Sequence, residues 1–275
     1  MAFNQSISAG VQQTQFLFYD INGEPSGDSP TPLANAQYAG AYQWVGIQEF
    51  PSGIPEAEAV PIPGDDTLLG SILFSSDAPR EGLITFGQMD LELEARMQNT
   101  LVESLGDIRM GLIDTASTIL ATGALITQAR SVKRSTGVQG AAGWSGLIYP
   151  NVQVQPLNRE TLSGRTAGSY RYKYVAQQAF YKPWGITISD EVNGDIAAYA
   201  IPFTSPYPLT MGAFRGDGAT VNWTLHKTPI NVNKTRPFSD KLALAVTSVT
   251  PSTKVMVLTS PVAVNRPASV VFEWS

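Results

Sequence analysis

His226 is the only histidine of the chain, so acid–base or nucleophilic catalysis through an imidazole would have to use it. It lies in the segment LHKTPI, directly after an alternating stretch from Val221 to Leu225. A Ser-His-Asp system needs a nucleophile beside the imidazole, and the chain has no GxSxG elbow to hold one. A histidine at the end of a strand is the ordinary structural case. We therefore expect a protein that is not an enzyme.

The other residues that could do chemistry have unsuitable spacing. The glycines of residues 137–143 form GxxGxxG, which is not a dinucleotide fingerprint, and no Walker A lysine follows a glycine-rich loop. The carboxylate pairs Asp65-Asp66 and Asp190-Glu191 could offer oxygen ligands to calcium, but the EF-hand spacing is absent and a solvated turn is favoured. Cysteine is absent, which excludes disulfides and thiolate metal sites. We expect neither a cofactor nor a metal.

The stretch from Thr166 to Ser189, TAGSYRYKYVAQQAFYKPWGITIS, predicts one long strand with two different faces. Side chains alternate across a strand, which separates an aromatic face from a basic one. These side chains are Tyr170, Tyr172 and Tyr174 on one face and Arg171 and Lys173 on the other. From Ser169 to Lys182 such a strand would span roughly 45 Å, about twice the usual length. We expect it to run into a neighbouring copy and help build an assembly; the alternative is a strand that bends back within its own subunit.

The aromatic face of this strand has other uses. It could stack bases or sugars, but packing in a sheet core or an interface is favoured.

Charge is sparse and divided along the chain. Charged residues make up 15% of it, against roughly 25% in an ordinary soluble domain. Residues 1–130 hold 16 acidic and 4 basic residues, a balance of −12, whereas residues 131–275 hold 7 and 14, a balance of +7. Such halves could guide one copy onto another or neutralise each other inside one subunit. An acidic surface would not hold nucleic acid phosphates.

Alternating apolar residues and turn signals predict a mainly β chain with one helix. Residues 1–12 are small and polar, and we expect them to form an extended arm. Strands are expected over residues 15–21, 41–50, 57–62, 68–74, 82–86, 144–157 and 196–203. The helix is expected over Asp90 to Leu105, because apolar residues recur every fourth position from Leu93 and Asp90 can cap the first turn.

Two loops and a ribbon are expected to project from the body. The Pro- and Gly-rich segment Glu24 to Ala36 and the basic segment Ser131 to Gly143 have loop composition. Trp144 to Leu157 could pair with the long strand to make a two-stranded ribbon, through which oligomers exchange contacts. The candidate self-association residues are Tyr170, Arg171, Tyr172, Lys173, Tyr174, Lys133, Arg134, Asp28 and Glu24.

A second domain is expected at the C-terminus. Ile201 to Gly212 has three prolines in seven residues, which predicts a semi-rigid linker. An Asp217-Gly218 turn follows, and then short strands over residues 221–225, 242–246, 255–258 and 270–274. These strands suffice for a small Ig-like β-sandwich. We expect a self-assembly domain over residues 1–205 and a decoration domain over 213–275.

The order of these segments resembles that of the major tail tube proteins of tailed bacteriophages. The residues that carry the resemblance are GDDTLLGSILFSSDAP, the helix at Asp90, LITQARSVKR with its glycine-rich loop, GWSGLIYPNVQVQPL and YRYKYVAQQAFYKPWG. The C-terminal segments GDGATVNWTL, LALAVTSVT and VVFEW resemble the β-sandwich modules that phages attach to virion proteins.

The resemblance implies a tail-tube-like β-sandwich or barrel with one flanking helix. Six copies would close into a ring, and rings would stack into a tube through whose acidic lumen DNA passes without specific binding. Implied partners are further copies of the chain and other tail proteins, such as tape measure, terminator and baseplate proteins. The implied location is the virion tail, assembled in the host cytoplasm. The loops Glu24 to Ala36 and Ser131 to Gly143 would contact the next ring, and the C-terminal module would project outward.

Other functions stay open from the sequence. A capsid decoration protein or a carbohydrate-binding virion protein would use Trp223, Trp274 or the tyrosines of the long strand. A major capsid protein would need a long spine helix, whose pattern is missing. An enzyme on a β scaffold is disfavoured by the scarcity of histidine and cysteine. The start of the chain lacks a secretory signal pattern, and no run of ~18 apolar residues predicts a membrane-spanning helix.

Overall fold

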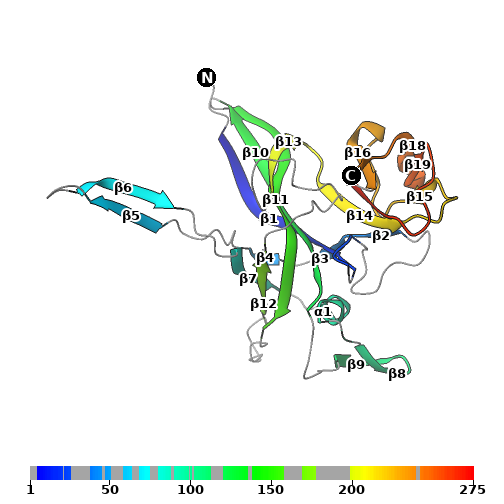
Figure 1. Cartoon of the computed structure of the whole chain (residues 1–275), viewed down its shortest axis with the longest axis horizontal. Coiled ribbons are helices and arrows are strands. Elements are labelled where there is room, and N and C mark those ends of the chain that lie inside the picture. Colours follow the sequence, from blue (N-terminus) through cyan, green and yellow to red (C-terminus); the bar gives the residue numbers. More distant parts are fainter. Residues whose placement is uncertain are drawn as a thin grey trace.

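Antiparallel strands make up most of the described chain, and one short α-helix flanks the large sheet (Figure 1). The computed structural model describes residues 5–20, 22–25, 38–44, 47–50, 58–63, 68–74, 80–87, 90–98, 100, 102–112, 120–135, 138–157, 169–177, 199–239 and 242–275. The mainly β fold class predicted from the sequence is confirmed, with a single short α-helix within these ranges.

The largest sheet has eight strands and curls on itself. Its main path runs through β3 (Tyr42–Trp44), β1 (Gln5–Phe18), β10 (Thr122–Ser135), β11 (Val138–Pro156), β12 (Tyr170–Ala176), β7 (Arg80–Phe86) and β4 (Ile47–Glu49), and β13 (Tyr199–Ser205) pairs with β11. The edge strands β3 and β4 are separated in sequence only by residues 45 and 46. No ladder joins these two strands in the described residues, so the sheet is curled without being a closed barrel.

The inner face of the curled sheet encloses the main hydrophobic core. Trp44 of β3 stacks on Phe86 of β7 with ring centroids 4.1 Å apart, which brings opposite ends of the sheet into contact. The helix α1 (Leu91–Met97) packs into this core with Leu93 and Met97. The other buried members are Phe16, Phe18, Ile84, Ala121, Leu125, Tyr149, Val152, Val154, Tyr172, Tyr174 and Ala176.

The helix begins as predicted but ends earlier. Asp90 caps it by accepting hydrogen bonds from the backbone N–H groups of Glu92 and Leu93. The helix stops at Met97, and the last residues of the expected helix form β8 (Val102–Leu105), which pairs with β9 (Ile108–Leu112) in a hairpin. The predicted extent to Leu105 was therefore wrong. Gly106 takes a positive φ of 61° in the hairpin turn, a conformation that glycine adopts without strain.

The C-terminal part forms a small β-sandwich, as predicted. One sheet contains β17 (Leu242–Ala243), β16 (Thr235–Ser239), β20 (Pro267–Glu273), β14 (Leu209–Arg215) and β2 (Tyr38–Gly40). The other contains β15 (Asn222–Thr224), β19 (Val255–Leu258) and β18 (Val246–Thr250), and short 3-10 turns lie at Val232–Lys234 and Pro251–Thr253. Trp223, Leu225, Met256 and Phe272 are buried between the two sheets.

The sandwich is packed against the outer face of the curled sheet. Leu17, Ala124 and Ile126 of that face form one buried cluster with Met211 and Ala213 of β14. The predicted linker over residues 201–212 was wrong, because β13 and β14 occupy most of it. Proline is tolerated in β13 because this strand pairs only along one edge in the described structure. The parts expected as residues 1–205 and 213–275 thus share a core, and β2 of the first completes a sheet of the second.

Two segments expected to be irregular are strands. β1 starts at Gln5 and pairs with β10 from Gln5 opposite Arg134, so most of the predicted N-terminal arm belongs to the sheet. The predicted loop from Ser131 to Gly143 forms the ends of β10 and β11, which pair up to Ser135 opposite Val138. Pairing between these strands satisfies backbone groups that a loop would leave to water.

The tyrosine strand is shorter than predicted. β12 ends at Ala176, and residues 178–198 lie outside the described part of the chain. Its predicted pairing with the strand before it is confirmed, since β12 runs antiparallel to the C-terminal part of β11. Its other edge pairs with β7, so β12 lies inside the sheet and is not part of a projecting ribbon.

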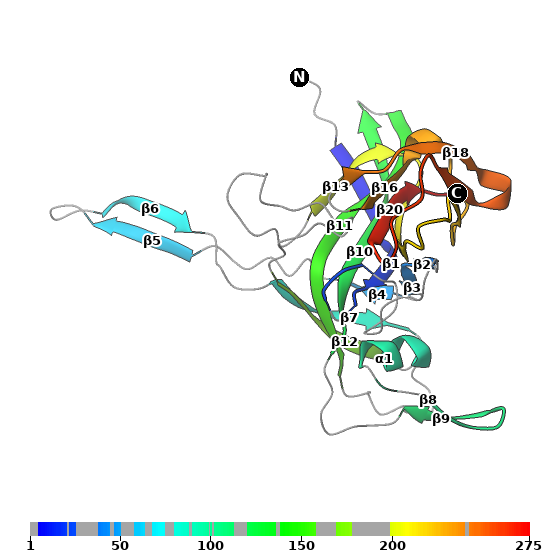
Figure 2. The same cartoon turned by 45° about the vertical axis from the view of Figure 1, so that its right-hand side comes forward.

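Two hairpins do project from the body (Figure 2). The first is β5 (Glu58–Pro63) with β6 (Leu68–Phe74), close to the strands predicted there. The second is β8 with β9, beside α1. Each forms a two-stranded sheet without a third strand among the described residues.

Candidate self-association surfaces

The tyrosine face of β12 belongs to this chain's own core. Tyr172 and Tyr174 are buried, and the hydroxyl of Tyr172 donates a hydrogen bond to the buried carboxylate of Glu94 on α1. The Tyr174 ring stacks on Phe50 with centroids 5.1 Å apart, and burial raises the pKa of its hydroxyl. These two side chains are therefore not accessible to another copy, a base or a sugar. The rest of the predicted long strand, beyond residue 177, lies outside the described residues.

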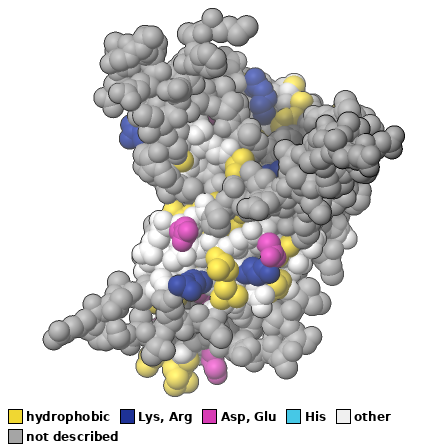
Figure 3. All heavy atoms as spheres, turned by 90° about the vertical axis from the view of Figure 1, so that its left-hand side faces the viewer, with side chains coloured by type: hydrophobic (Ala, Val, Ile, Leu, Met, Phe, Trp, Pro, Cys, Tyr) yellow, Lys and Arg dark blue, Asp and Glu magenta, His cyan; other side chains and the backbone are white. Residues whose placement is uncertain are grey.

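The opposite face of β12 is accessible. Arg171 is exposed, and Lys173 lies 2.8 Å from a carboxylate oxygen of Glu81 on β7. Leu83, which stands opposite Lys173 in the ladder, is also exposed. Among the described side chains on the face shown in Figure 3, charges of both signs are mixed with hydrophobic groups. The role of Arg171 and Lys173 in self-association stays a prediction.

The remaining candidates lie apart from this face. Lys133 and Arg134 stand near the end of β10, opposite Ser6 and Gln5 of β1; their side chains are outside the described structure. Glu24 lies beside the turn after β1, and Asp28 falls outside the described residues. The predicted residues therefore do not form one site.

The most exposed apolar residues that the structure describes near α1 are at the tip of the β8–β9 hairpin. Leu105, Ile108 and Met110 are 71%, 63% and 63% exposed. This hairpin was not predicted, because Leu101 and Leu105 continue the helical spacing of the residues before them. The signal that could have revealed it is the pair Gly106-Asp107 between two short apolar stretches, which is a hairpin turn pattern.

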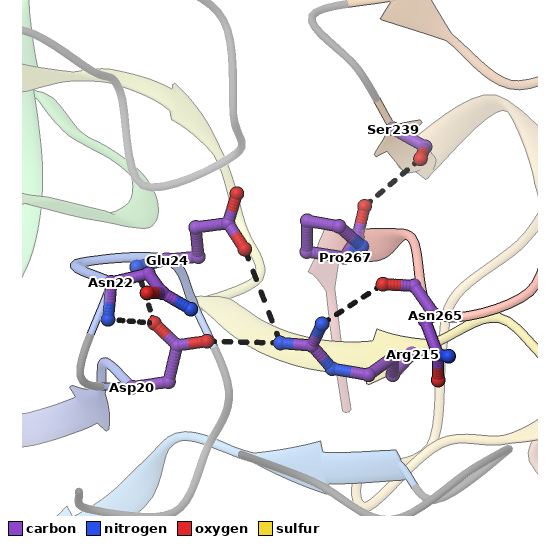
Figure 4. Close-up of polar contacts among 7 residues, drawn as sticks. All are labelled: Asp20, Asn22, Glu24, Arg215, Ser239, Asn265 and Pro267. Atoms are coloured by element: carbon purple, nitrogen blue, oxygen red, sulfur yellow. Dashed lines mark hydrogen bonds and ion pairs between the residues drawn. The ribbon is translucent and has the colours of Figure 1, made fainter.

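A buried ion pair connects the curled sheet to the sandwich (Figure 4). The Asp20 carboxylate after β1 lies 2.9 Å from Arg215 Nη2 on β14. Its other oxygen accepts from the backbone N–H groups of Asn22 and Glu24, each at 2.9 Å. Arg215 also donates to the backbone oxygen of Asn265 in the sandwich at 2.9 Å. The pair thus has hydrogen bonds on both sides, which a buried pair needs in order to offset its loss of water.

The histidine considered for catalysis lies at the same junction. Burial, with Lys227 and Lys254 nearby, lowers the pKa of His226 to about 4, so the ring is neutral at pH 7. Its ring nitrogens lie 2.8 Å from the hydroxyl of Tyr38 and 3.0 Å from that of Thr210. Neither partner is a nucleophile held against an accessible surface: Thr210 is fully buried. The arrangement is suited to joining β2, which carries Tyr38, to β14, which carries Thr210.

The tryptophans considered for sugar binding both contact the sandwich core. Trp223 is buried in the sandwich core, and Lys227 Nζ lies 4.6 Å from the ring centroid of Trp274. A sugar platform needs an open aromatic face. The pairs Asp65-Asp66 and Asp190-Glu191 lie outside the described residues.

In the part of the chain that the structure covers, no group of three or more His, Asp or Glu side chains is placed to hold a metal ion. The helices of the same part are too short or too polar to cross a bilayer. Comparisons with protein-family models, curated proteins and solved structures find no match to this chain.

Proposed function

We propose that the protein is a structural virion subunit that associates with copies of itself, and that the assembly is a bacteriophage tail tube of stacked rings through which DNA passes. The observation that supports this most is the pair of projecting hairpins. Two-stranded hairpins are marginally stable alone in water, so a third strand or a packed face would stabilise each of them. A neighbouring copy can supply that contact.

The β8–β9 hairpin is the better described of the two. Its tip carries Leu105, Ile108 and Met110, whose exposed apolar surface would be removed from water in an interface. The sparse charge of the chain and its division into an acidic and a basic half also favour contacts between copies. The mainly β architecture with one flanking helix is the kind of fold that the resemblance implies.

The proposed contacts differ from those expected from the sequence. β12 is paired on both edges and its Tyr172 and Tyr174 are buried, so it does not offer a strand edge to a neighbour. The hairpins take its place in the proposal, with Arg171 and Lys173 on the accessible face of β12 as further contact candidates.

Negative-stain electron microscopy of the concentrated full-length protein, together with light scattering, tests the proposal. We expect rings or tubes. A variant that combines Leu105→Ser, Ile108→Ser and Met110→Ser should keep the circular dichroism and melting behaviour of the fold and lose the assemblies. The matched control combines Leu242→Ser and Val264→Ser, which are 70% and 59% exposed on the sandwich and should leave assembly unchanged.

The outcomes separate the competing functions. Single particles at every concentration would contradict self-assembly and favour a decoration protein, and closed shells would favour a capsid protein. Tubes that form equally well in the triple variant would retain self-assembly but exclude the hairpin as its contact.

A further inference from the structure

The segment of residues 38–44 crosses from one sheet to the other. β2 pairs with β14 of the sandwich, with Gly40 opposite Gly212. β3, which follows at once, pairs with β1 of the curled sheet. Between them, the backbone N–H of Ala41 donates to Met211 at 2.8 Å. These seven residues therefore tie the two sheets together, and what holds β2 in place also controls the junction.

His226 is the side chain that packs on β2. Its ring lies over Gly40 so closely that a Cβ added at Gly40 would be 2.2 Å from the ring Cγ. Tyr38 stacks beside the ring with centroids 5.8 Å apart, and Phe272 of β20 meets it edge-on at 5.6 Å. The imidazole thus fills a site that is shaped by β2 on one side and β20 on the other.

The hydrogen bonds around the ring fix its tautomer. The hydroxyl of Thr210 donates its single proton to Gln15 Oε1 on β1 at 2.7 Å. Thr210 can then only accept from His226, so Nε2 carries the proton, and Nδ1 accepts from the hydroxyl of Tyr38. The side-chain amide of Gln15 in turn donates to the backbone oxygen of Leu209. From Tyr38 through His226 and Thr210 to Gln15, each group donates to the next, and this row of hydrogen bonds is complete only with a neutral ring.

Charges near the ring oppose its protonation. Lys227 and Lys254 both disfavour the imidazolium. From β2 the titratable group at the ring is Tyr38, whose pKa is raised by burial, so it stays protonated and donates. β14 and β20 present Thr210 and Phe272 to the ring, and Gln15 of β1 accepts from Thr210; none of these three side chains titrates. A proton on Nδ1 would meet the hydroxyl that now donates to it.

We propose that His226 is an acid-sensitive latch, which holds β2 on β14 while it is neutral and releases β2 when it takes up a proton. In the folded state the pKa of His226 is about 4, below its ordinary value of 6.5, so the unfolded chain binds more protons between these two values. The support that the neutral ring gives is therefore complete above about pH 6.5 and is lost as the pH falls toward 4. Ala41 and Trp44, which follow β2, are buried in the hydrophobic clusters on either side of the junction, which makes the release local to β2.

The single histidine allows a direct test by nuclear magnetic resonance of the full-length protein. Ring nitrogen spectra should show the Nε2–H tautomer at pH 7 and one titration with a pKa far below 6.5. Hydrogen exchange of peptides covering β2, corrected for the intrinsic effect of pH, should rise through the same titration. Peptides covering β19 should stay protected, which distinguishes local release from unfolding.

Three variants complete the test. Tyr38→Phe removes the donor to Nδ1 and should move the histidine pKa and the release to higher pH. Tyr42→Phe, on the same segment but bonded to Asp90, should move neither. His226→Gln should abolish the pH dependence of exchange at β2, whatever its level at pH 7.

The proposal is overturned by an Nδ1–H tautomer, by a histidine pKa that Tyr38→Phe does not raise, or by an unchanged acid-induced release in His226→Gln. None of these results bears on self-assembly, which is tested separately by microscopy.

Discussion

Asp20 and Arg215 form a buried ion pair, 2.9 Å between Oδ2 and Nη2, across the boundary between the curled sheet and the sandwich. The two residues are 195 positions apart in sequence. Because the Asp20 side chain is fully buried and Arg215 is mostly so, the pair is specific to one arrangement of the two sheets. It is the clearest sign that the C-terminal sandwich is docked in a defined position.

Removing one partner of this pair should be strongly destabilising. Arg215→Met leaves the Asp20 carboxylate buried without its cation, and we expect a loss of about 3–5 kcal/mol in the free energy of unfolding. Lys234→Met, which removes the partly exposed bond to Glu273, should cost under about 1 kcal/mol. Urea titration measures both. Equal losses would show that Asp20 is not desolvated as the structure has it.

The close approach of β10 and β11 at Gly146 should forbid any side chain there. A Cβ at this position would lie 1.9 Å from the backbone oxygen of Thr127, which cannot move without opening the ladder. We expect Gly146→Ala to lower the free energy of unfolding by at least about 1–3 kcal/mol. At Gly23, where nothing lies within 4 Å of the added Cβ and only the positive φ opposes it, alanine should cost about 1 kcal/mol. Similar melting temperatures for the two variants would contradict this.

The cap of α1 should have a measurable effect on stability. Asp90→Ala removes the acceptor of two backbone N–H groups and of the Tyr42 hydroxyl, and a lost cap costs typically about 1–2 kcal/mol. Asp90→Asn keeps an acceptor and should recover most of that loss. Thermal unfolding followed by circular dichroism would compare them; an alanine variant as stable as the asparagine variant would rule out the cap.

The buried Tyr172 hydroxyl should matter because its acceptor is ionisable. Tyr172→Phe leaves the buried Glu94 carboxylate with one donor fewer, at a cost of about 1.5–3 kcal/mol. Tyr170→Phe, at the start of the same strand and only partly buried, should change stability by less than about 0.5 kcal/mol. Denaturant unfolding curves of the two variants give this comparison, provided that the dependence of the free energy of unfolding on denaturant is the same for both. A Tyr172→Phe variant as stable as the original protein would show that the hydroxyl is exposed to water.

Local rules in the sequence determined much of the fold. Alternation of apolar residues located β6 and β19 at their observed bounds, and it separated the tyrosine and basic faces of β12. Asp90 marked the start of the helix, and the Asp217-Gly218 turn preceded the buried alternation around Trp223. These features depend on a residue and its near neighbours, so they can be recognised without the fold.

Partners distant in sequence decided the rest. The alternation could not say whether Tyr172 and Tyr174 would face a neighbour or their own core, because this depends on Trp44, Phe50 and α1. Leu101 and Leu105 have helical spacing, but Leu105 instead pairs with Ile108 in the hairpin whose turn contains Gly106. The place of His226 and Arg215 between the sheets follows from β2 joining β14, a pairing between residues more than 170 positions apart. Such contacts form only when the whole chain packs, so only the tertiary structure reveals them.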